Sequence, residues 1–453
     1  MSGVEPLHIA YLVSAPGIPL GGLSGSTRHV ESITRALVSL GHRVTLFAAR
    51  GQGVTGGEAD TGRSAVESAG TGGSAGFRGR LRIHLLSEPR GPVPGFPGRA
   101  VAEARRSWRF ACRAAAWLRF DPPDLVLERY DLFSTAGRIL RHRFGVPWIL
   151  EVNAPLRLER AWFEGFSAPL LDRLAERATL GAADRLVVVS NPLRDYVCTS
   201  VGVPRHRVVV TGNGVDPVRF AGRRRSLSGR AVVRGNGFVV GFLGSLKPWH
   251  GADTWVDVVA KAHRARPSIH GIVVGDGPEL DRMRRRVRES GLERVVRFTG
   301  FVPPDQVPDV LAAMHLLLAP YPRIEPFYFA PLKILEALAA SVPVVTSAQG
   351  DLPDLVDGAG RTVPCDDPDT MARTIVEAFD HPDLLNHWRT IAPGRVVGRA
   401  WQDVAGRIVA LGRACRRDFH HSRRGHGPSG RNGGPVPPLP EGYRKAPGDT
   451  GPT

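Results

Sequence analysis

Short apolar runs alternate with longer amphipathic stretches along most of the chain. The first apolar run, residues 7–13, leads into a glycine-rich loop, a helical pattern over residues 26–40 and a second apolar run at residues 43–48. Apolar side chains in the helical pattern return on one face, and Gly41 ends it. Apolar strands joined by helices predict a doubly wound α/β fold, with a parallel sheet covered on both faces.

The alternation continues in two series of strands. A single hydrophobic core stops growing at roughly 250–300 residues, so two domains are expected for a chain of 453 residues. Further strands are predicted at residues 82–86, 125–127, 148–152 and 185–189 in the first series, and at residues 238–242, 271–274, 295–299, 316–319 and 342–346 in the second.

Changes in composition give the expected domain boundaries. The first domain is predicted at residues 1–215 and the second at residues 216–398. Residues 51–79, rich in Gly, Ser, Thr and Ala, predict a disordered insertion in the first domain. A final amphipathic helix is expected at residues 399–418, followed by a disordered basic tail at residues 419–453.

The formal net charge of +17 comes almost entirely from arginine and is spread along the whole chain. Without zinc-finger spacing or an RNA-binding aromatic motif it does not favour nucleic acid, whereas phosphorylated substrates and anionic membrane surfaces fit it. Four scattered cysteines predict neither a disulfide framework nor a zinc site. No leader or membrane span is visible, so a cytoplasmic protein is expected, possibly peripheral at the inner membrane face.

Glycine loops follow several predicted strands. Gly21 and Gly22 follow the first strand, and Gly244 begins a loop that also holds Lys247 and His250. Glycine lets a ligand approach the backbone, and the two basic side chains could supply charge to a diphosphate. The alternative is that the first loop is only a flexible connection and that Lys247 is a solvated surface lysine.

Two further strand ends carry candidate binding residues. Gly275 and Asp276 form a turn after residues 271–274, where the carboxylate could face a nucleotide or only cap the next helix. Gly300 closes the next strand, where its backbone could lie beside a base.

Residues 325–346 form the most informative segment. A proline-bounded aromatic loop leads into a short helix that carries Lys333 and Glu336, and a β-branched strand follows. Backbone N–H groups, a cation and a carboxylate at the start of a helix suit a phosphorylated, hydroxylated ligand. The segment therefore predicts a nucleotide-sugar site.

In their order along the chain, these segments resemble the family 4 glycosyltransferases, which are retaining, nucleotide-sugar-dependent enzymes of the GT-B fold. The matching segments are residues 28–30, 41–44, 213–216, 244–251, 274–278, 298–300 and 325–343. The resemblance implies two Rossmann-like domains that face each other across a cleft. The acceptor would bind to the first domain and the nucleotide sugar to the second, and the last helix would return to the first domain.

The resemblance also implies roles for single residues. Glu336 would bind the ribose hydroxyls, because a carboxylate accepts hydrogen bonds from a cis-diol. Lys247 would neutralise the diphosphate, and Gly21 and Gly22 would close the cleft from the other side. His29, which follows that loop, is a candidate for substrate binding. The start of the helix would hold the donor sugar or its phosphates, through residues Phe329, Ala330, Pro331, Leu332 and Lys333.

Two features depart from the family pattern. A second glutamate is usual eight positions before Glu336, but Tyr328 stands there, and Glu325 is the nearest acidic residue upstream. Either Glu325 reaches the site or donor recognition differs. In the glycine loop, Ser245 and His250 occupy the places of the usual arginine and lysine.

The acceptor side offers Glu151 and Asn153, at the end of the strand at residues 148–152. They are candidates for acceptor binding, with helix capping or a structural ion pair as the alternative.

No metal or cofactor is expected, because the acidic cluster at residues 366–369 reads as a turn that caps a helix. The leading hypothesis is therefore transfer of a sugar from a nucleoside diphosphate to a polysaccharide, lipid-linked or small-molecule acceptor. The alternatives are a non-catalytic nucleotide-sugar-binding protein and an epimerase or phosphorylase on the same fold.

Overall fold

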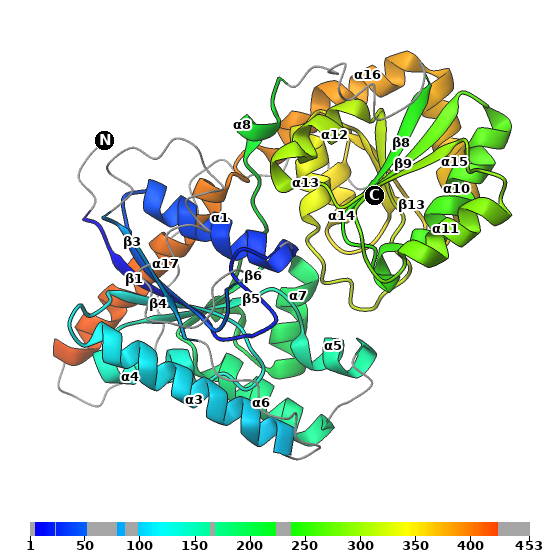
Figure 1. Ribbon diagram of the computed structural model, residues 1–453. Coiled ribbons are helices and arrows are strands. Elements are labelled where there is room, and N and C mark those ends of the chain that lie inside the picture. Colours follow the sequence, from blue (N-terminus) through cyan, green and yellow to red (C-terminus); the bar gives the residue numbers. More distant parts are fainter. Residues whose placement is uncertain are drawn as a thin grey trace, which may run out of the picture.

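Two parallel sheets, each between two layers of helices, form the two lobes of the molecule (Figure 1). The computed structural model describes residues 5–22, 24–51, 79–86, 98–163, 168–222 and 237–424. The strand order is β3-β2-β1-β4-β5-β6-β7 in the first sheet and β10-β9-β8-β11-β12-β13 in the second. The predicted fold class, two doubly wound parallel sheets, is confirmed.

The first sheet is built around β1, in which all six residues are buried. Ala10 and Leu12 belong to one core and Ile9 and Tyr11 to the other, because successive side chains of a strand point to opposite faces. This explains why β1 has no polar face. The strands are β1 (His8–Val13), β2 (Arg43–Ala48), β3 (Leu81–Leu85), β4 (Leu125–Arg129), β5 (Trp148–Val152), β6 (Arg185–Val188) and β7 (Val208–Val210).

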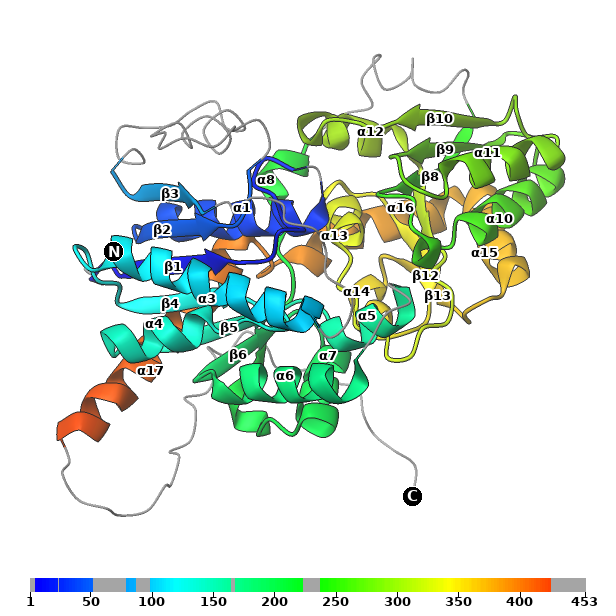
Figure 2. The same cartoon turned by 60° about the horizontal axis from the view of Figure 1, so that its bottom comes forward.

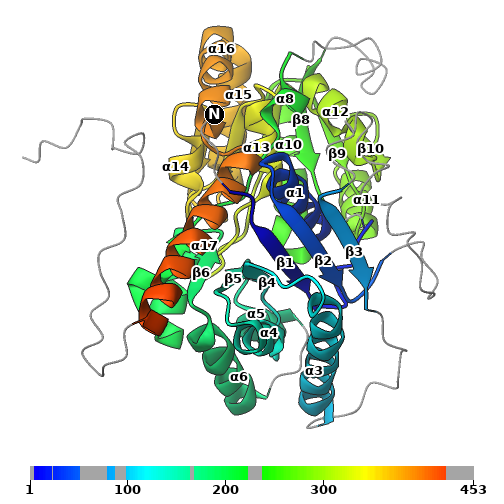
Figure 3. The same cartoon turned by 90° about the vertical axis from the view of Figure 1, so that its left-hand side faces the viewer.

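Helices cover both faces of the first sheet. The core around Ile9 includes residues of α1 and of the final helix, α17, whereas the core around Leu12 includes residues of α3, α4, α6 and α7 (Figure 3). The helices are α1 (Gly25–Ser39), α3 (Gly98–Leu118), α4 (Ala136–Phe144), α5 (Leu156–Phe163), α6 (Pro169–Ala182) and α7 (Asn191–Tyr196), with a π-helical turn at Val197–Val201 and a 3-10 turn at Arg205–Arg207.

The second sheet repeats this plan around β8, which is also buried along its whole length. Val240 and Phe242 belong to one core and Val239 and Leu243 to the other. The strands are β8 (Phe238–Leu243), β9 (Ile269–Val274), β10 (Val296–Gly300), β11 (Leu316–Ala319), β12 (Val344–Ser347) and β13 (Gly360–Val363).

Helices of the second domain again lie on both faces of its sheet. The helices are α8 (Pro217–Phe220), α10 (Ala252–Ala265), α11 (Leu280–Glu289), α12 (Val307–Ala313), α13 (Leu332–Ala339), α14 (Leu352–Val356), α15 (Pro368–Asp380) and α16 (Pro382–Ile391), with 3-10 turns at Pro248–His250, Pro304–Gln306 and Ala392–Val396.

The last helix, α17 (Trp401–Arg424), lies along the first domain (Figure 2). Where the chain enters and leaves the second domain, Val215 pairs with Ala400 in an isolated parallel bridge. A Cβ on Gly214 would lie 2.6 Å from the Trp401 ring, so only glycine fits this crossing.

Three predictions about chain organisation need comment. Because α17 continues to Arg424, the predicted disordered tail cannot begin at residue 419. Residues 52–78 of the predicted insertion lie outside the described residues, and the domain boundary at residue 215 stays a prediction. None of the helices in the described ranges is long and apolar enough to cross a bilayer.

Candidate functional site

The glycine loops of the second domain pack directly on one another at the carboxyl ends of β8 and β9. Gly275 has a φ of +131°, and a Cβ there would overlap the carbonyl oxygen of Gly244. A Cβ on Gly277 would lie 2.6 Å from the carbonyl oxygen of Leu246. These glycines therefore bring the loop after β9 against the loop after β8.

Asp276 and Gly300 lie at the same edge of the sheet. The exposed Asp276 carboxylate accepts a hydrogen bond from the Gly277 N–H at 2.7 Å. The carbonyl oxygen of Gly300 accepts one from the Gly275 N–H at 2.9 Å, and nothing lies within 4 Å of a Cβ built on Gly300. The loops after β8, β9 and β10 thus form a surface of backbone atoms that is open at Gly300. We call this surface the backbone shelf.

Lys333 is a buried cation that points toward this shelf. It is 8% exposed, and its ammonium group has no hydrogen-bond partner in the described part of the chain. The nitrogen lies 4.7 Å from the ring centroid of Phe242, and a Cβ on Gly244 would be 3.7 Å from it. Burial lowers the pKa of Lys333 to about 7. An anion beside Gly244 would supply the counter-charge that this buried ammonium lacks.

The two other basic side chains of the loop after β8 differ in charge. Burial, together with the charge of Lys333, lowers the pKa of His250 to about 3, and its Nδ1 contacts the carbonyl oxygen of Ser245. This lowered pKa disfavours a charged His250 ring in the ligand-free protein, and the binding role of His250 stays a prediction. Lys247 is half-buried, with its nitrogen 5.9 Å from the ring centroid of Trp249. Lys333 and Lys247 are therefore the candidate cations beside the loop after β8.

Glu336 lies one turn after Lys333 and faces the other domain. Its Oε1 accepts a hydrogen bond from Nη2 of Arg28, in α1, at 2.6 Å. Glu336 is 7% exposed, and burial raises its pKa while the charges of Arg28 and Arg219 oppose that shift. The carboxylate predicted to bind ribose is thus held in a salt bridge between the domains.

The loop that leads into α13 contacts the first domain through several predicted donor-site residues. The carbonyl oxygen of Ala330 accepts a hydrogen bond from Nδ2 of Asn213 at 2.6 Å. Phe329 packs against a core of each domain, and the Leu332 side chain packs against the core that includes α1. Pro331 precedes the helix without a side-chain cap. The Ile334 N–H donates to the carbonyl oxygen of Pro331 at 3.2 Å. The N–H groups before it have no carbonyl behind them within the helix, so they could bind a ligand.

Tyr328 and Glu325 differ sharply in burial. Tyr328 is 2% exposed, its hydroxyl donates to Glu159 of α5, and its carbonyl oxygen accepts from Ser190 at 2.7 Å. Glu325 is exposed. The position of the missing glutamate is therefore taken by a tyrosine that anchors the loop to the first domain, and the carboxylate beside it is Glu159.

The glycine loop of the first domain is a tight turn in front of α1. Gly21 has a φ of +75°, and its N–H donates to Glu31 Oε1 at 2.9 Å. A Cβ on Gly22 would lie 2.9 Å from the carbonyl oxygen of Pro19. Glycine is required here for backbone geometry, and the turn stands opposite α13, since Gly25 lies next to Leu332.

Glu151 and His29 form a buried network. Glu151 accepts from Tyr11 at 2.8 Å and from Arg129 at 3.1 Å, and it lies 2.6 Å from Nε2 of His29. These cations and hydrogen bonds outweigh burial and lower the pKa of Glu151 to about 2. Each is at most 5% exposed and engaged by protein groups, which favours the alternative of a structural ion pair, and their role in substrate binding stays a prediction.

The network continues from His29 to the loop that leads into α13. Nδ1 of His29 lies 2.8 Å from Oδ1 of Asn213, the residue that donates to Ala330. The His29 ring also stands edge-on to Trp401, with centroids 5.0 Å apart. His29 therefore positions the junction between the domains.

Asn153 differs from Glu151 although only one residue separates them. Its Oδ1 is buried without a hydrogen-bond partner in the described residues, as is Oγ of Ser14, which follows β1. Buried polar groups are normally paired. At these strand ends of the first domain, Oδ1 of Asn153 can accept a hydrogen bond from a hydroxylated ligand, and the Ser14 hydroxyl can donate or accept one.

The sequence-based prediction missed three residues that the fold brings to this junction: Arg28, Asn213 and Glu159. Arg28 and Asn213 lie inside segments that carry the family resemblance, so there was a reason in the sequence to include both among the candidate site residues. Glu159 carries no such signal, because only the packing of α5 on Tyr328 brings it to the junction.

Comparison with protein families gives the identity. A model described as Glycosyltransferase Family 4 matches residues 23–219, and one described as Glycosyl transferases group 1 matches residues 237–381. The chain belongs to the family 4 (group 1) glycosyltransferases. It is therefore a transferase, as predicted.

Relatives of this glycosyltransferase act on cyclitols by name. The chain is 31% identical over 342 residues to 2-deoxystreptamine N-acetyl-D-glucosaminyltransferase of Streptomyces fradiae, covering 70% of this chain and 75% of that protein. It is 29% identical over 308 residues to D-inositol 3-phosphate glycosyltransferase of Corynebacterium jeikeium, covering 64% and 71%.

Solved structures confirm the GT-B fold. Sucrose-phosphate synthase of Thermosynechococcus elongatus superposes with a TM-score of 0.69 at 19% identity, covering 92% of this glycosyltransferase and 100% of that chain. HepE of Anabaena in complex with UDP-glucose superposes with a TM-score of 0.67 at 18% identity, covering 90% and 100%.

Proposed function

We propose that this glycosyltransferase moves a sugar from a nucleoside diphosphate to a hydroxyl group of a small cyclitol, with retention of configuration. Both relatives described above are named for cyclitol acceptors, 2-deoxystreptamine and inositol phosphate. Of the predicted acceptor classes, the small molecule is therefore favoured over a polysaccharide or a lipid-linked glycan.

The buried, unpaired ammonium of Lys333 beside Gly244 is the observation that carries the proposal. A diphosphate on the backbone shelf would bring the missing counter-charge, with Lys247 as a second cation. The N–H groups of Phe329, Ala330 and Leu332 would bind the donor sugar or its phosphates, since the start of a helix favours negative charge. Glu336 would accept hydrogen bonds from the ribose hydroxyls while sharing its carboxylate with Arg28.

The same groups would drive the chemistry. As the bond from the anomeric carbon to the diphosphate breaks, negative charge grows on the leaving group. Lys333, Lys247 and the helix N-terminus would stabilise that charge in a site from which water is excluded. The acceptor hydroxyl would attack from the face that the diphosphate leaves. Fixed cations could do this without a metal, so independence of metal ions remains part of the proposal.

The acceptor would lie on the first domain, near Asn153 and Ser14. Both present buried polar atoms without a protein partner, and a cyclitol offers a ring of hydroxyl groups that could bond to them.

An assay with purified protein tests the proposal. UDP-, GDP-, ADP- and dTDP-sugars are combined with 2-deoxystreptamine or inositol phosphate, with and without EDTA, and products are analysed by mass and by the anomeric coupling constant. We expect one nucleotide to support transfer to a cyclitol with unchanged anomeric configuration, and Lys333→Met to abolish it. Transfer to neither cyclitol would refute the acceptor class, and an inverted product would refute retention.

A further inference from the structure

The outer surface of α3, α4 and α6 is charged with a single sign. These helices cover the face of the first sheet away from α17 (Figure 3). Within the described residues 98–163 and 168–182, exposed arginines are numerous and no carboxylate is exposed. We call this surface the basic face, and its exposed arginines include Arg105, Arg119, Arg138, Arg143, Arg173 and Arg177.

The acidic residues of the same helices do not neutralise the basic face. Asp172 and Glu176 are each 1% exposed, and Glu176 bonds to Arg157 at 2.8 Å and to Tyr196 at 2.9 Å. Glu103 accepts from Arg160 at 3.0 Å. These carboxylates are directed to inward-facing partners, so among the described residues they do not offset the charges of Arg138, Arg173 and Arg177 on the outer surface.

Exposed apolar side chains gather in the same region. Thirteen large apolar side chains are exposed in the described residues, and nine of them belong to α3, α5, α6 and the residues directly after α3. On α6, Leu170 and Leu174 are 77% and 64% exposed and alternate with Arg173 and Arg177 at helical spacing. The nine are Val101, Trp108, Trp117, Phe120, Trp162, Phe163, Leu170, Leu171 and Leu174.

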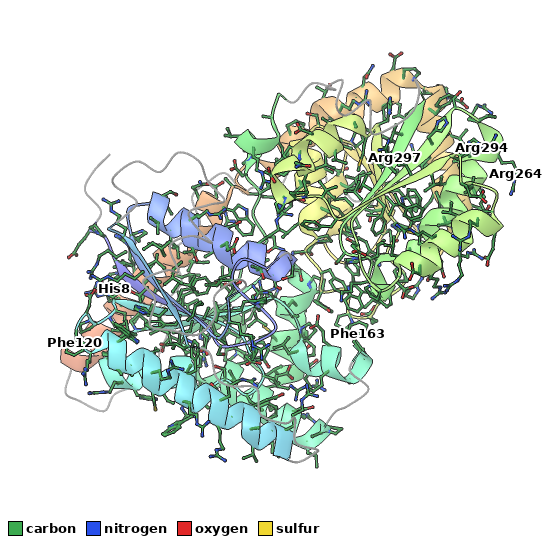
Figure 4. All side chains as sticks on the ribbon, in the orientation of Figure 1. His8, Phe120, Phe163, Arg264, Arg294 and Arg297 are labelled. Atoms are coloured by element: carbon green, nitrogen blue, oxygen red, sulfur yellow. The ribbon has the colours of Figure 1, made fainter. Side chains whose placement is uncertain are left out.

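An ion-pair cluster joins these helices at the domain junction. Arg160 of α5 contacts Glu103 of α3 at 3.0 Å and Asp172 of α6 at 3.5 Å. In the same helix, the Phe163 ring lies 4.3 Å from the Trp249 ring of the second domain. The basic face therefore runs from Phe120, at the far end of α3, to the junction at Phe163 (Figure 4).

We propose that the basic face docks on a bilayer that contains anionic phospholipids. Arginine binds lipid phosphates, and exposed leucine and tryptophan enter the boundary between headgroups and acyl chains. Nucleic acid would use the arginines, but leucine neither stacks on bases nor hydrogen-bonds to them. The inference is independent of the donor and acceptor, because docking involves no residue of the proposed sugar site.

Vesicle co-sedimentation of the full-length protein tests this surface. We expect binding to mixed phosphatidylglycerol and phosphatidylcholine vesicles, weakened by salt, and little binding to phosphatidylcholine alone. One arginine near an anionic surface is worth about fivefold in affinity. Arg173→Glu/Arg177→Glu should therefore weaken binding by at least tenfold, and Leu170→Ser/Leu174→Ser should weaken it also at high salt.

Matched variants on the second domain serve as controls. Arg264→Glu/Arg294→Glu makes the same charge change at the far side of the molecule (Figure 4), and Val218→Ser/Val397→Ser removes two residues that are 85% and 76% exposed. Both should bind vesicles like the wild type. Absence of binding to anionic vesicles, or equal losses in control and test pairs, would overturn the proposal. So would preferential binding to duplex DNA that is unaffected by Leu170→Ser/Leu174→Ser.

Discussion

Lys333 and Glu336 stand one helical turn apart, and burial acts against the charge of both. It lowers the pKa of Lys333 to about 7 and raises that of Glu336. The salt bridge to Arg28 offsets part of this cost for Glu336, whereas among the described residues Lys333 is contacted by the rings of Phe242 and Tyr321 and by no hydrogen-bond partner. In the ligand-free protein Lys333 is therefore a destabilising residue, which is typical of a binding group kept for its ligand.

Lys333→Met is predicted to stabilise the fold and to abolish nucleotide binding. The folded pKa of Lys333 lies below the unfolded value, so between about pH 7 and 10 the unfolded chain binds more protons and wild-type stability rises with pH. Below pH 7 the cost of the buried charge is present in full. Melting curves should show the largest gain for Lys333→Met there, and calorimetry should show at least tenfold weaker binding of the nucleoside diphosphate.

Lys261→Met is the control for that experiment, since Lys261 lies far from the shelf and pairs with Asp369. An unchanged or lower melting temperature for Lys333→Met below pH 7 would show that the buried charge of Lys333 does not destabilise the fold.

Glu336→Ala is predicted to fold normally and to lose most transfer activity, with the KM for the donor raised at least tenfold. The reason is the loss of a carboxylate with two acceptor oxygens at the proposed ribose position. Steady-state kinetics of Glu336→Ala and of the matched variant Glu325→Ala show which of the two carboxylates binds the donor. A larger defect in Glu325→Ala would move the role of the missing glutamate to the exposed loop.

At the residue scale, the sequence predicted which segments form the site but not which side chains are available in it. Glu151 and Asn153 both follow the same strand, yet one is enclosed by Tyr11, Arg129 and His29 and the other is left with a free oxygen. That difference depends on neighbours from other strands and helices, which a single sequence does not show.

At the scale of elements, interior strands were predicted and two edge strands were missed. β1 and β8 are buried on both faces and appear as continuous apolar runs. β7 has three residues, and β13 consists of Gly360, Arg361, Thr362 and Val363. An edge strand has one neighbour and less to bury, so its hydrophobic pattern is short or absent.

Gly275→Ala is predicted to destabilise the second domain much more than Gly300→Ala. At Gly275 a Cβ overlaps the carbonyl oxygen of Gly244, which adds steric strain to an unfavourable φ of +131°. The expected cost is roughly 2–4 kcal/mol. Gly300 has a φ of +68° and open space, so its alanine should cost about 1–2 kcal/mol. Urea unfolding of both variants measures the difference, and equal costs would contradict the close packing of the two loops.

At the scale of the molecule, side-chain contacts hold the two domains together around the proposed donor site. Arg28 bonds to Glu336, Asn213 to Ala330, and Asn191 to Asp351 at 2.8 Å. The three contacts link the first domain to α13, to the loop before it and to the loop after β12, so groups of the proposed donor site also join the two domains.

Arg28→Ala is predicted to loosen the ligand-free protein. Losing the partially buried salt bridge to Glu336 should raise the radius of gyration in small-angle X-ray scattering, because closure then rests on fewer contacts. Arg35→Ala, on the same helix and facing Glu31, is the control and should leave the scattering unchanged. Identical curves for all three proteins would show that the pair does not control closure.

The pairing of Val215 with Ala400 has a consequence for engineering. Trp401 and following residues of α17 pack into the core of the first domain, so both ends of the chain contribute to that domain. The second domain is inserted between the two connecting segments that pair at Val215 and Ala400. A chimera that takes its second domain from another enzyme must therefore replace the internal segment between these two connections and keep the native C-terminal helix. A simple fusion of two halves would leave the first domain without its own last helix.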